Sequence, residues 1–449
     1  MKRLAFLAAC LVALPSFAQS VPNCMQRSQQ LLDALKAHNY AAATKHFDAQ
    51  VAAVVTPDRL EQVWARGLPM RFGDYDALAK GQKPKRQPDG VIVTPLHFAR
   101  GWFHMRVTCN TKGAISGFRF LPGRTARPGE AEHAGPKAAH GDWGTSTPIE
   151  VTSPWGPLPG LLTLPKGKGP FPAVVLVGGS GPHDYDETIG PNKPFRDIAR
   201  GLAAHGIASL RYDKRTYAFP QRSERDMRMT IDEEVTDDAI TAAHQLASHA
   251  NIDSRRVFLV GHSLGAMLAP RIGRRDPSLA GLVLLAAPAR SLLTVIGEQT
   301  RELGPGRGLS PQRIAKAEAA RRDERKLLAS ADPAHPPKGR YLHAPQSYWM
   351  SLRDYDQVAV ARSLHMPMLF LQGKADFQVS PTHDFARWKQ VFANDPAVHF
   401  QAYPGLSHLF MHAGKTRTVA DYMKPRHVAP KVIDDMAAWI LKQPLRTAH

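Results

Sequence analysis

Long hydrophobic runs are missing from this chain of 449 residues, although 43% of its residues are hydrophobic. The apolar run at residues 4–14 is too short to cross a bilayer, and no later stretch approaches the roughly 20 apolar residues that a transmembrane helix needs. The apolar content is typical of a globular protein, and the length exceeds that of a single ordinary core. We therefore expect two domains and no transmembrane segment.

The chain also lacks a long basic run with interleaved aromatic residues. Its 58 Lys and Arg outnumber its 39 Asp and Glu, which gives a formal net charge of +19, but the basic residues are scattered. A field of this sign attracts anionic surfaces or substrates, whereas a nucleic-acid interface gathers its basic residues on one face. Nucleic acid is therefore not an expected partner.

Cysteine is scarce, with Cys10, Cys24 and Cys109 as the three examples. Cys10 lies in the amino-terminal segment, where a basic start, an apolar run and small residues up to Ala18 predict a secretory signal peptide over residues 1–18. Lipoprotein-type cleavage before a lipidated Cys10 is the alternative, but the apolar run before it is unusually short. We expect an exported protein, periplasmic or secreted.

Signal cleavage would leave Cys24 and Cys109 as the cysteines of the mature chain. In an oxidising compartment such a pair favours a disulfide. Both residues lie in the amino-terminal third, so the bridge would staple that region alone. Two free buried cysteines are the alternative.

Residues 19–121 predict a small α+β domain. Apolar residues recur at helical spacing over residues 24–50, and Thr56 as cap with Pro57 at the first helical position predicts a second helix. Strands are expected where polar and apolar residues alternate, at residues 91–94, 102–108 and 115–120. Nothing in this region assembles a catalytic group. Residues 122–144, rich in Gly, Pro, Ala and charge, are expected to be a linker.

Residues 145–449 form the second expected domain, which is predicted to open with a hairpin and then alternates strand and helix signals. After the strand at residues 170–177, the expected elements are a helix at 193–205, a strand at 207–212, a helix at 231–248 and a strand at 257–260. Such alternation predicts a mostly parallel sheet with helices on both faces.

The stretch Gly261-His262-Ser263-Leu264-Gly265 joins the last of these strands directly to a helix. Glycines two residues before and after Ser263 let the strand and the helix pass each other, and a serine at this turn presents its hydroxyl at the carboxyl edge of the sheet. The Leu264 N–H, in the first helical turn, points toward an anion formed there. The pattern predicts a nucleophile elbow; an ordinary turn with a chance Gly-x-Ser-x-Gly is the alternative.

A second anion donor is expected in residues 178–181, Gly-Gly-Ser-Gly, at the end of an earlier strand. A glycine-rich turn at a strand's carboxyl end leaves backbone amides uncovered. We therefore assign the Ser180 N–H as the partner of the Leu264 N–H in an oxyanion hole. A phosphate-binding loop is the alternative, but its Gly-Lys-Ser/Thr ending is missing.

An acid and a base follow in the required order. Asp376 comes directly after the strand at residues 367–373, where an aspartate can orient an imidazole, and His408 ends the loop after the next strand. Asp384 is the weaker acid and His412 the competing base. His408 and His412 imitate a two-histidine metal pair, but no glutamate follows His408 and no third ligand stands out, so no metal is expected.

Residues from about 290 to 350 interrupt the alternation with two charge-rich, helix-like segments. An insertion here would lie over the carboxyl edge of the sheet as a lid; an ordinary solvated excursion is the alternative. Tyr348 and Trp349 are candidates for lining an acyl pocket, and equally for docking the insertion.

The order Ser263, Asp376, His408 matches that of catalytic triads in the α/β-hydrolase superfamily. The motifs that carry the resemblance are residues 178–186, 211–215, 261–270, 373–376 and 405–408. Within the superfamily, the chain is similar to exported bacterial serine esterases of the dienelactone-hydrolase-like or acyl-peptidase-like branch, in which a small domain precedes the hydrolase. The resemblance implies an α/β-hydrolase fold with a helical lid, cleavage of a small-molecule carboxylic ester through an acyl-enzyme, and no metal or organic cofactor.

Two features depart from the common pattern. Gly178 stands where many relatives have histidine, but a backbone donor does not depend on that side chain. Pro270 lies inside the helix after the elbow, where a proline is expected to kink it. The segment 211–215 contains three basic residues, Arg211, Lys214 and Arg215. They either meet an anionic acyl tail or form a structural salt bridge through Asp213, and the salt bridge is favoured.

Other functions stay open. A thioesterase or a serine peptidase would use the same triad, although no propeller or second substrate domain is recognisable in the sequence. The small domain could instead be the functional unit, as a binding or dimerisation module carried on a hydrolase scaffold, which leaves a homodimer open.

Overall fold

The computed structural model describes residues 23–69, 75–78, 84–87, 90–98, 101–122, 136–305, 309–332, 334–414, 421–422 and 424–445. Contacts between Cα atoms divide the chain into two compact units, Met1–Thr125 and Ala126–His449. The predicted signal peptide over residues 1–18, with Cys10, lies outside the described residues. None of the helices in the described ranges is long and apolar enough to cross a membrane.

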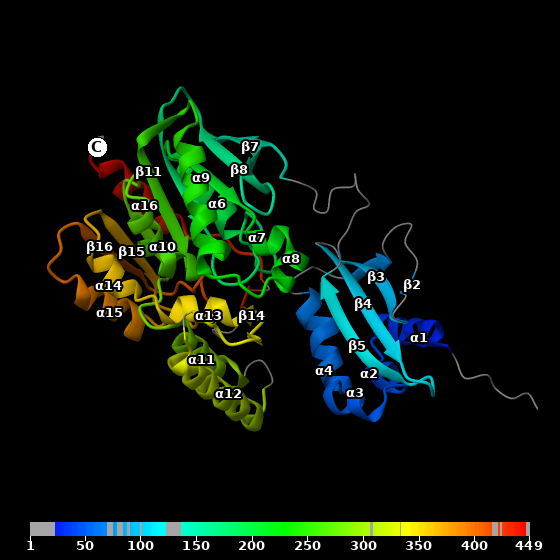
Figure 1. Ribbon diagram of the computed structural model, residues 1–449. Helices are drawn as coiled ribbons and strands as arrows, with labels where there is room; N and C mark the ends of the chain where they lie inside the picture. Colours follow the sequence, from blue (N-terminus) through cyan, green and yellow to red (C-terminus); the bar gives the residue numbers. More distant parts are fainter. Residues whose placement is uncertain are drawn as a thin grey trace, which may run out of the picture. The chain divides into compact units, whose positions relative to one another are not determined.

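The first unit packs short helices against a five-stranded antiparallel sheet (Figure 1). Its sheet order is β1-β3-β4-β5, with β2 paired to β3. Leucines of the helices, such as Leu32 and Leu35, share a core with Leu96, Phe98 and Met105 of the sheet. The elements are α1 (Cys24–Lys36), α2 (Tyr40–Thr44), α3 (Ala49–Val54), α4 (Pro57–Glu61), β1 (Tyr75–Leu78), β2 (Lys85–Arg86), β3 (Ile92–Phe98), β4 (Gly101–Cys109) and β5 (Ile115–Pro122).

The helix expected over residues 24–50 is wrong, because the structure divides this segment into three helices. His38 has a left-handed φ of 53°, which ends the first helical path, and the Asn39 side chain then caps α2 by accepting from the Ala42 N–H. Asp48 caps α3 in the same manner. Short polar side chains that bond the backbone compete with a continuing helix. The start expected at Thr56 and Pro57 is confirmed by α4.

A disulfide joins Cys24 and Cys109 within the first unit, with their Cα atoms 5.6 Å apart. It connects the first residue of α1 to the last residue of β4. The two cysteines are 85 positions apart, so the covalent link closes most of this unit into one loop. Closing a long loop removes conformations from the unfolded chain and so stabilises the folded unit.

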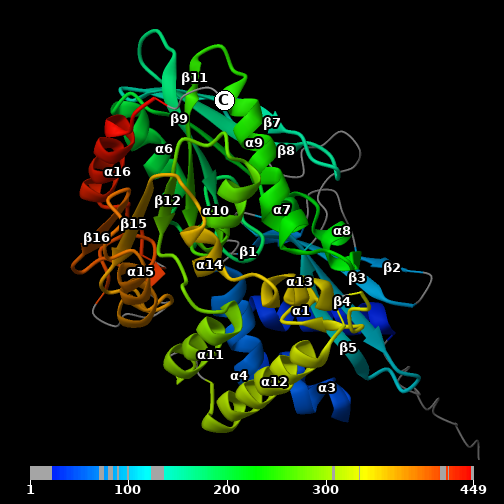
Figure 2. The same cartoon turned by 60° about the vertical axis from the view of Figure 1, so that its left-hand side comes forward.

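The second unit is built on a nine-stranded sheet with the order β16-β15-β12-β11-β9-β10-β8-β7-β6 (Figures 1 and 2). The six strands from β16 to β10 are parallel, and β8, β7 and β6 continue the sheet in antiparallel pairs. The strands are β6 (Ala139–Gly141), β7 (Gly144–Val151), β8 (Leu158–Pro165), β9 (Phe171–Val177), β10 (Ala208–Tyr212), β11 (Ile252–His262), β12 (Leu282–Leu285), β15 (Met368–Gly373) and β16 (Val398–Tyr403). β6 begins inside the segment expected as a linker over residues 122–144, because this segment supplies the outermost strand pairing of the sheet.

Helices cover both faces of this sheet, as the alternation of strand and helix signals predicts. Val174 and Val260 face α6 (Pro194–Ala204) and α16 (Pro430–Lys442), whereas Val175 and Leu259 face α9 (Asp237–Ala247) and α10 (Leu264–Arg275). Strands buried on both faces need continuous apolar sequences, and the burial of all but the first residue of β9 meets that need. α10 continues through Pro270 to Arg275.

The insertion at residues 290–350 contains α11 (Leu292–Leu303), α12 (Pro311–Ser330), β13 (Arg340–Tyr341) and β14 (Ala344–Pro345), and it ends in α13 (Gln346–Arg353). The Gln299 side chain donates to the Gln378 carbonyl at 2.9 Å, which ties α11 to the loop after β15. The Ser347 hydroxyl donates to the Met229 carbonyl at 2.8 Å. The insertion is therefore attached to the edge of the sheet where the parallel strands end (Figure 2). The remaining helices of the unit are α7 (Arg215–Ala218), α8 (Pro220–Arg225), α14 (Gln357–Arg362) and α15 (Ala386–Val391).

Replacing both bridged cysteines, Cys24→Ser with Cys109→Ser, is expected to lower the free energy of unfolding of the first unit by about 2–5 kcal/mol, because the unfolded chain regains the conformations that the loop excludes. Urea unfolding of the full chain, followed by fluorescence, measures the loss. The transition of the second unit serves as the internal control and should not move. An unchanged first transition would contradict this expectation.

Candidate active site

Ser263 occupies the sharp turn between β11 and α10, with φ 53° and ψ −112°. A positive φ is uncommon outside glycine and stores strain that the surroundings must support. A Cβ on Gly261 would lie 2.4 Å from the Gly265 carbonyl oxygen, and one on Gly265 would lie 2.2 Å from the Val177 carbonyl oxygen. Gly261 is therefore required for β11 and α10 to approach each other this closely, and Gly265 for α10 to approach the end of β9.

Asp376 and His408 form a buried hydrogen-bonded pair beyond the ends of β15 and β16. His408 Nδ1 lies 2.8 Å from Asp376 Oδ2, and the two residues are 4% and 7% exposed. The same carboxylate accepts from the Gln378 and Val379 amides at 2.7 and 3.0 Å and from Gln372 Nε2 at 2.9 Å. With Nδ1 donating to the carboxylate, Nε2 of His408 is the nitrogen that can accept a proton.

His408 reaches the elbow through the residue that precedes Ser263. His262 Nε2 lies 3.0 Å from the His408 carbonyl oxygen, and the two imidazole rings are 4.6 Å apart between centroids. In the described parts of the chain the Ser263 hydroxyl has no hydrogen-bond partner, a geometry that is common in unliganded enzymes, where the catalytic bond tightens with substrate. The structure thus brings the three predicted residues to one edge of the sheet.

The two predicted oxyanion donors also border this edge. Ser180 follows β9, and the preceding Gly179 is so close that a Cβ on it would lie 3.2 Å from the Ser263 Cβ. The Ser180 amide and the Leu264 amide donate to no other group within the described ranges. Leu264 is the first residue of α10, where backbone N–H groups point out of the helix and favour an anion. Both amides remain available to a ligand.

The weaker candidates take other roles. Asp384 is fully buried and accepts from the amides of Ala289 and Arg290 at 2.9 and 3.1 Å and from the Arg290 guanidinium at 2.7 Å. Hydrogen bonding to Asp384 raises the pKa of Arg290. His412 is exposed and its carbonyl accepts from Arg426. Asp384 therefore anchors the start of the insertion, and Asp376 is the carboxylate that holds His408.

Tyr348 and Trp349 are buried in the insertion. Trp349 Nε1 donates to the Tyr341 carbonyl at 2.8 Å, and the rings of Tyr348 and Trp349 make an edge contact at 5.5 Å. Burial, and then the nearby Glu234, raise the pKa of Tyr348 well above its ordinary value. These contacts dock α13, and acyl binding by the two residues stays a prediction.

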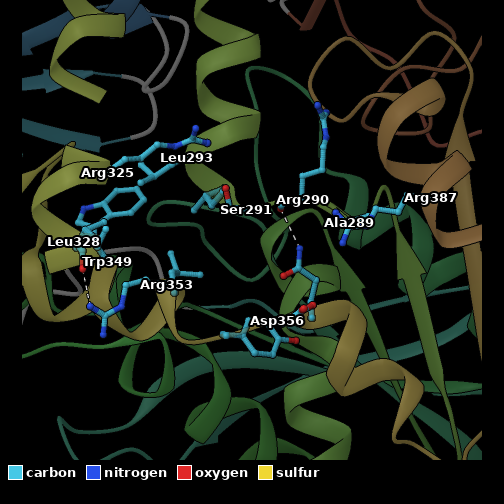
Figure 3. A pocket seen from close by; sticks show the side chains of 15 residues that line it. Ala289, Arg290, Ser291, Leu293, Arg325, Leu328, Trp349, Arg353, Asp356 and Arg387 are labelled. Atoms are coloured by element: carbon cyan, nitrogen blue, oxygen red, sulfur yellow. Dashed lines mark hydrogen bonds between the residues drawn. The ribbon is translucent and has the colours of Figure 1, made fainter. Parts of the chain in front are cut away.

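Trp349 also borders a cavity of about 320 Å³ between the insertion and the rest of the second unit. Figure 3 shows that arginines surround it, with Arg290, Arg325, Arg353 and Arg387 among the labelled side chains. The residues that line it do not include Ser263, Asp376 or His408. This cavity is therefore separate from the candidate active site.

The salt bridge expected through Asp213 is wrong, since each basic residue pairs elsewhere. Asp213 accepts from the Tyr185 amide at 2.7 Å, and burial raises its pKa well above the ordinary range, so it is a poor counter-ion. The pairs that form are Arg211 with Asp186 at 3.0 Å, Lys214 with Glu234 at 2.8 Å, and Arg215 with Asp238 at 2.5 Å. Lys214 Nζ also donates to the Gly179 carbonyl at 2.9 Å, and this bond helps to fix the glycine-rich loop.

Sequence reasoning missed Glu187 and His262. Glu187 Oε1 accepts from the Gly179 amide at 2.6 Å and lies 2.9 Å from His262 Nδ1. The acidic residues after the glycine-rich turn, and a histidine next to the predicted nucleophile, were the available signals. The described residues contain no group of three His, Cys, Asp or Glu side chains that would suit a metal ion.

Comparisons with known proteins identify the family of the chain. Residues 192–413 match the family model described as serine aminopeptidase S33. Esterase EstD of Thermotoga maritima is 34% identical over 408 residues, which cover 91% of this chain and 93% of that protein. Esterase FrsA of Klebsiella pneumoniae is 28% identical over 217 residues, 47% of this chain and 48% of its own length. The solved structure of Est1E from Butyrivibrio proteoclasticus overlaps 66% of this chain and 98% of its own, with 14% identity and a TM-score of 0.42.

Asp384→Asn distinguishes the role of Asp384 from that of Asp376. The substitution removes the charged partner that Arg290 has in Asp384 and leaves Glu298 as its other carboxylate, so we expect the second unit to lose about 2 kcal/mol of its free energy of unfolding. The bond between Asp376 and His408 does not involve Asp384, so turnover of a short p-nitrophenyl ester at low temperature should remain near the wild-type rate. Urea unfolding and steady-state kinetics measure the two quantities. Lost turnover in a folded variant would assign Asp384 a role in the reaction.

Proposed function

Because this chain belongs to the serine esterases of the α/β-hydrolase superfamily, we propose that it cleaves small-molecule carboxylic esters by a Ser-His-Asp acyl-enzyme mechanism. Ser263 is the nucleophile, His408 the general base and acid, and Asp376 the carboxylate that orients His408. The 2.8 Å hydrogen bond between His408 and Asp376, beside a strained serine on a strand-to-helix turn, is the observation that carries the proposal.

In the first half-reaction His408 Nε2 takes the hydroxyl proton of Ser263 while Ser263 Oγ attacks the ester carbonyl carbon. Asp376 keeps the Nδ1–H tautomer and stabilises the imidazolium that forms. The carbonyl oxygen becomes an oxyanion, which the amides of Ser180 and Leu264 bind, and each such donor is worth about 3 kcal/mol in the barrier. The tetrahedral intermediate collapses, the C–O bond to the alcohol breaks, and His408 returns the proton to the leaving oxygen.

The second half-reaction repeats these steps with water. His408 removes a proton from water as its oxygen attacks the acyl-enzyme, and the same two amides bind the second oxyanion. The bond from the acyl carbon to Ser263 Oγ then breaks, the acid product leaves, and Ser263 regains its proton. These residues supply the whole reaction, so the mechanism calls on no metal and no organic cofactor.

Ser263→Ala is expected to reduce hydrolysis of short p-nitrophenyl esters on the order of 10⁶-fold, because removing the nucleophile disables the triad as a unit. The variant should keep the circular dichroism spectrum and the unfolding transition of the wild type. Labelling with a fluorophosphonate probe, read by mass spectrometry at Ser263, is the companion measurement. Wild-type turnover in the folded variant would sink the assignment.

The wild type and the Ser263→Ala variant also distinguish the alternative functions. A series of aryl esters, thioesters and amides, with Ser263→Ala as the blank, distinguishes an esterase from a thioesterase or a peptidase. A binding or dimerisation module on an inert hydrolase scaffold would leave Ser263 unlabelled by the fluorophosphonate, and light scattering of the wild type tests the homodimer. Esterase EstD, which aligns with 91% of the chain, carries the name of an esterase, and this favours esters.

We also propose that the protein is exported, to the periplasm or beyond. The basic start, the apolar run and the small residues up to Ala18 support this localisation, as does a cysteine pair that suits an oxidising compartment. Expression of the full chain in a bacterial host should yield a mature form that begins at Gln19 and is released with the periplasmic fraction. Intact mass and fractionation test this, and an unprocessed chain in the cytosol would contradict it.

A further inference from the structure

Glu187 and His262 form a buried pair beside the proposed nucleophile. The two residues are 1% and 4% exposed, and His262 immediately precedes Ser263. His262 Nδ1 lies 2.9 Å from Glu187 Oε1, and its Nε2 lies 3.0 Å from the carbonyl oxygen of His408. Glu187 itself is held in the left-handed region, with φ 50°. Strain and buried charge at one place are typical of functional sites.

The hydrogen-bond partners define the protonation of this pair. A carboxylate and a carbonyl oxygen are both acceptors, and a neutral imidazole has a single N–H to donate. Only the imidazolium of His262 donates to both at once. Glu187 Oε1 also accepts the Gly179 N–H at 2.6 Å, as an ionised carboxylate does well. The geometry therefore describes a buried ion pair between Glu187 and His262.

The pKa directions agree with the ion pair. Burial by itself lowers the pKa of His262, but the charge of Glu187 and the bond to it outweigh burial and leave the pKa raised. Burial raises the pKa of Glu187, and the charge and hydrogen bond of His262 reverse this and leave it lowered. The pair is therefore intact between the lowered pKa of Glu187 and the raised pKa of His262, and it is lost as the pH rises through the latter or falls through the former.

The ion pair holds three segments of the site. Glu187 fixes the Gly179 N–H, so that the next amide along, Ser180 N–H, is the one left for the oxyanion. His262 stands at the end of β11 and fixes the backbone of His408, whose ring is bound to Asp376. Glu187 bonds the glycine-rich loop and His262 bonds the His408 loop, so the pair links the two loops directly beside Ser263.

We propose that the Glu187–His262 ion pair is a positioning element, which holds the oxyanion loop and the His408 loop in register with Ser263. The inference rests on the proposed Ser-His-Asp mechanism. Other ionisable groups around the pair are Asp376, the His408 ring, His183, whose Nε2 lies 2.9 Å from the Ser180 carbonyl, and Lys214 below Gly179. Within the described residues Glu187 Oε2 is buried without a hydrogen-bond partner.

Glu187→Gln tests the proposal. A neutral amide keeps an acceptor for the Gly179 N–H but no longer holds the second proton on His262, so the bond to the His408 carbonyl is lost. We expect kcat to fall on the order of 100-fold, as for a misplacement of about 1 Å, with KM little changed. Fluorophosphonate labelling of Ser263 should slow by a similar factor. The alkaline limb of the kcat profile that follows His262 in the wild type should disappear.

Asp232→Asn is the matched control. It removes a carboxylate that pairs with Arg271 at 2.7 and 2.6 Å, away from the triad, so it should lower stability and leave kcat and the pH profile unchanged. A folded Glu187→Gln variant with wild-type kcat and pH profile would overturn the positioning role. A wild-type protein that is not labelled at Ser263 would overturn the mechanism instead, and so the two failures are distinguishable.

If Glu187→Gln does not fold, a measurement on the wild type tests whether the Glu187–His262 ion pair exists. Nitrogen-15 NMR of histidine-labelled protein, with His262 identified by its loss in His262→Gln or by titration in step with kcat, reports the protonation of both ring nitrogens. We expect one buried histidine to stay doubly protonated well above the ordinary pKa of about 6.5. If every buried histidine is neutral at pH 7.5, the ion pair does not exist and the proposal fails.

Discussion

The turn at Ser263 is the constraint on which the rest of the second unit depends. A non-glycine residue with φ 53° and ψ −112° persists only where its neighbours hold it. Close packing stabilises this conformation of Ser263, because Gly261 and Gly265 allow β11, α10 and β9 to contact one another. A hydrogen bond also stabilises it, since the Ser263 N–H donates to the Leu285 carbonyl of the neighbouring β12 at 2.9 Å.

The sheet order turns this local turn into a site. β11 lies between β9 and β12, and β15 and β16 follow beyond β12, all running parallel. Parallel strands bring their carboxyl ends to one edge, so the loops that carry Ser180, Ser263, Asp376 and His408 meet although the residues are far apart in the chain. The hydrophobic effect builds the sheet, through strands buried on both faces, and the loops carry the chemistry.

Electrostatics then completes the arrangement. Asp376 accepts from two amides, a glutamine and His408, so its position is determined from several sides. The insertion is attached by apolar residues such as Leu293 and Leu328, which share the core of the sheet, and by polar contacts such as that of Arg290 with Asp384. Buried polar groups are thus concentrated where the loops meet, and apolar ones where the layers pack.

Much of the fold was predictable from the sequence, because periodicity and turn chemistry are local. The strand before Ser263, the helix after it, the alternation of elements and the cap at Thr56 all follow from neighbouring residues. The helix over residues 24–50 was wrong, since Asn39 and Asp48 compete for the backbone at points that apolar spacing does not reveal. The linker was overestimated, because strand pairing at the edge of a sheet depends on a partner strand that is distant in sequence.

The sequence by itself determined the strand-turn-helix at Ser263, the order of serine, acid and histidine, and the class of sheet, since each depends on residue type at short range. Only the tertiary structure decided which carboxylate meets which base. Asp376 rather than Asp384 reaches His408, Arg211 pairs with Asp186 rather than Asp213, and Glu187 lies against His262 across 75 positions of chain. The physical reason is that a buried charge needs a partner in space, and the loops that supply the partner are brought together only when the sheet has formed.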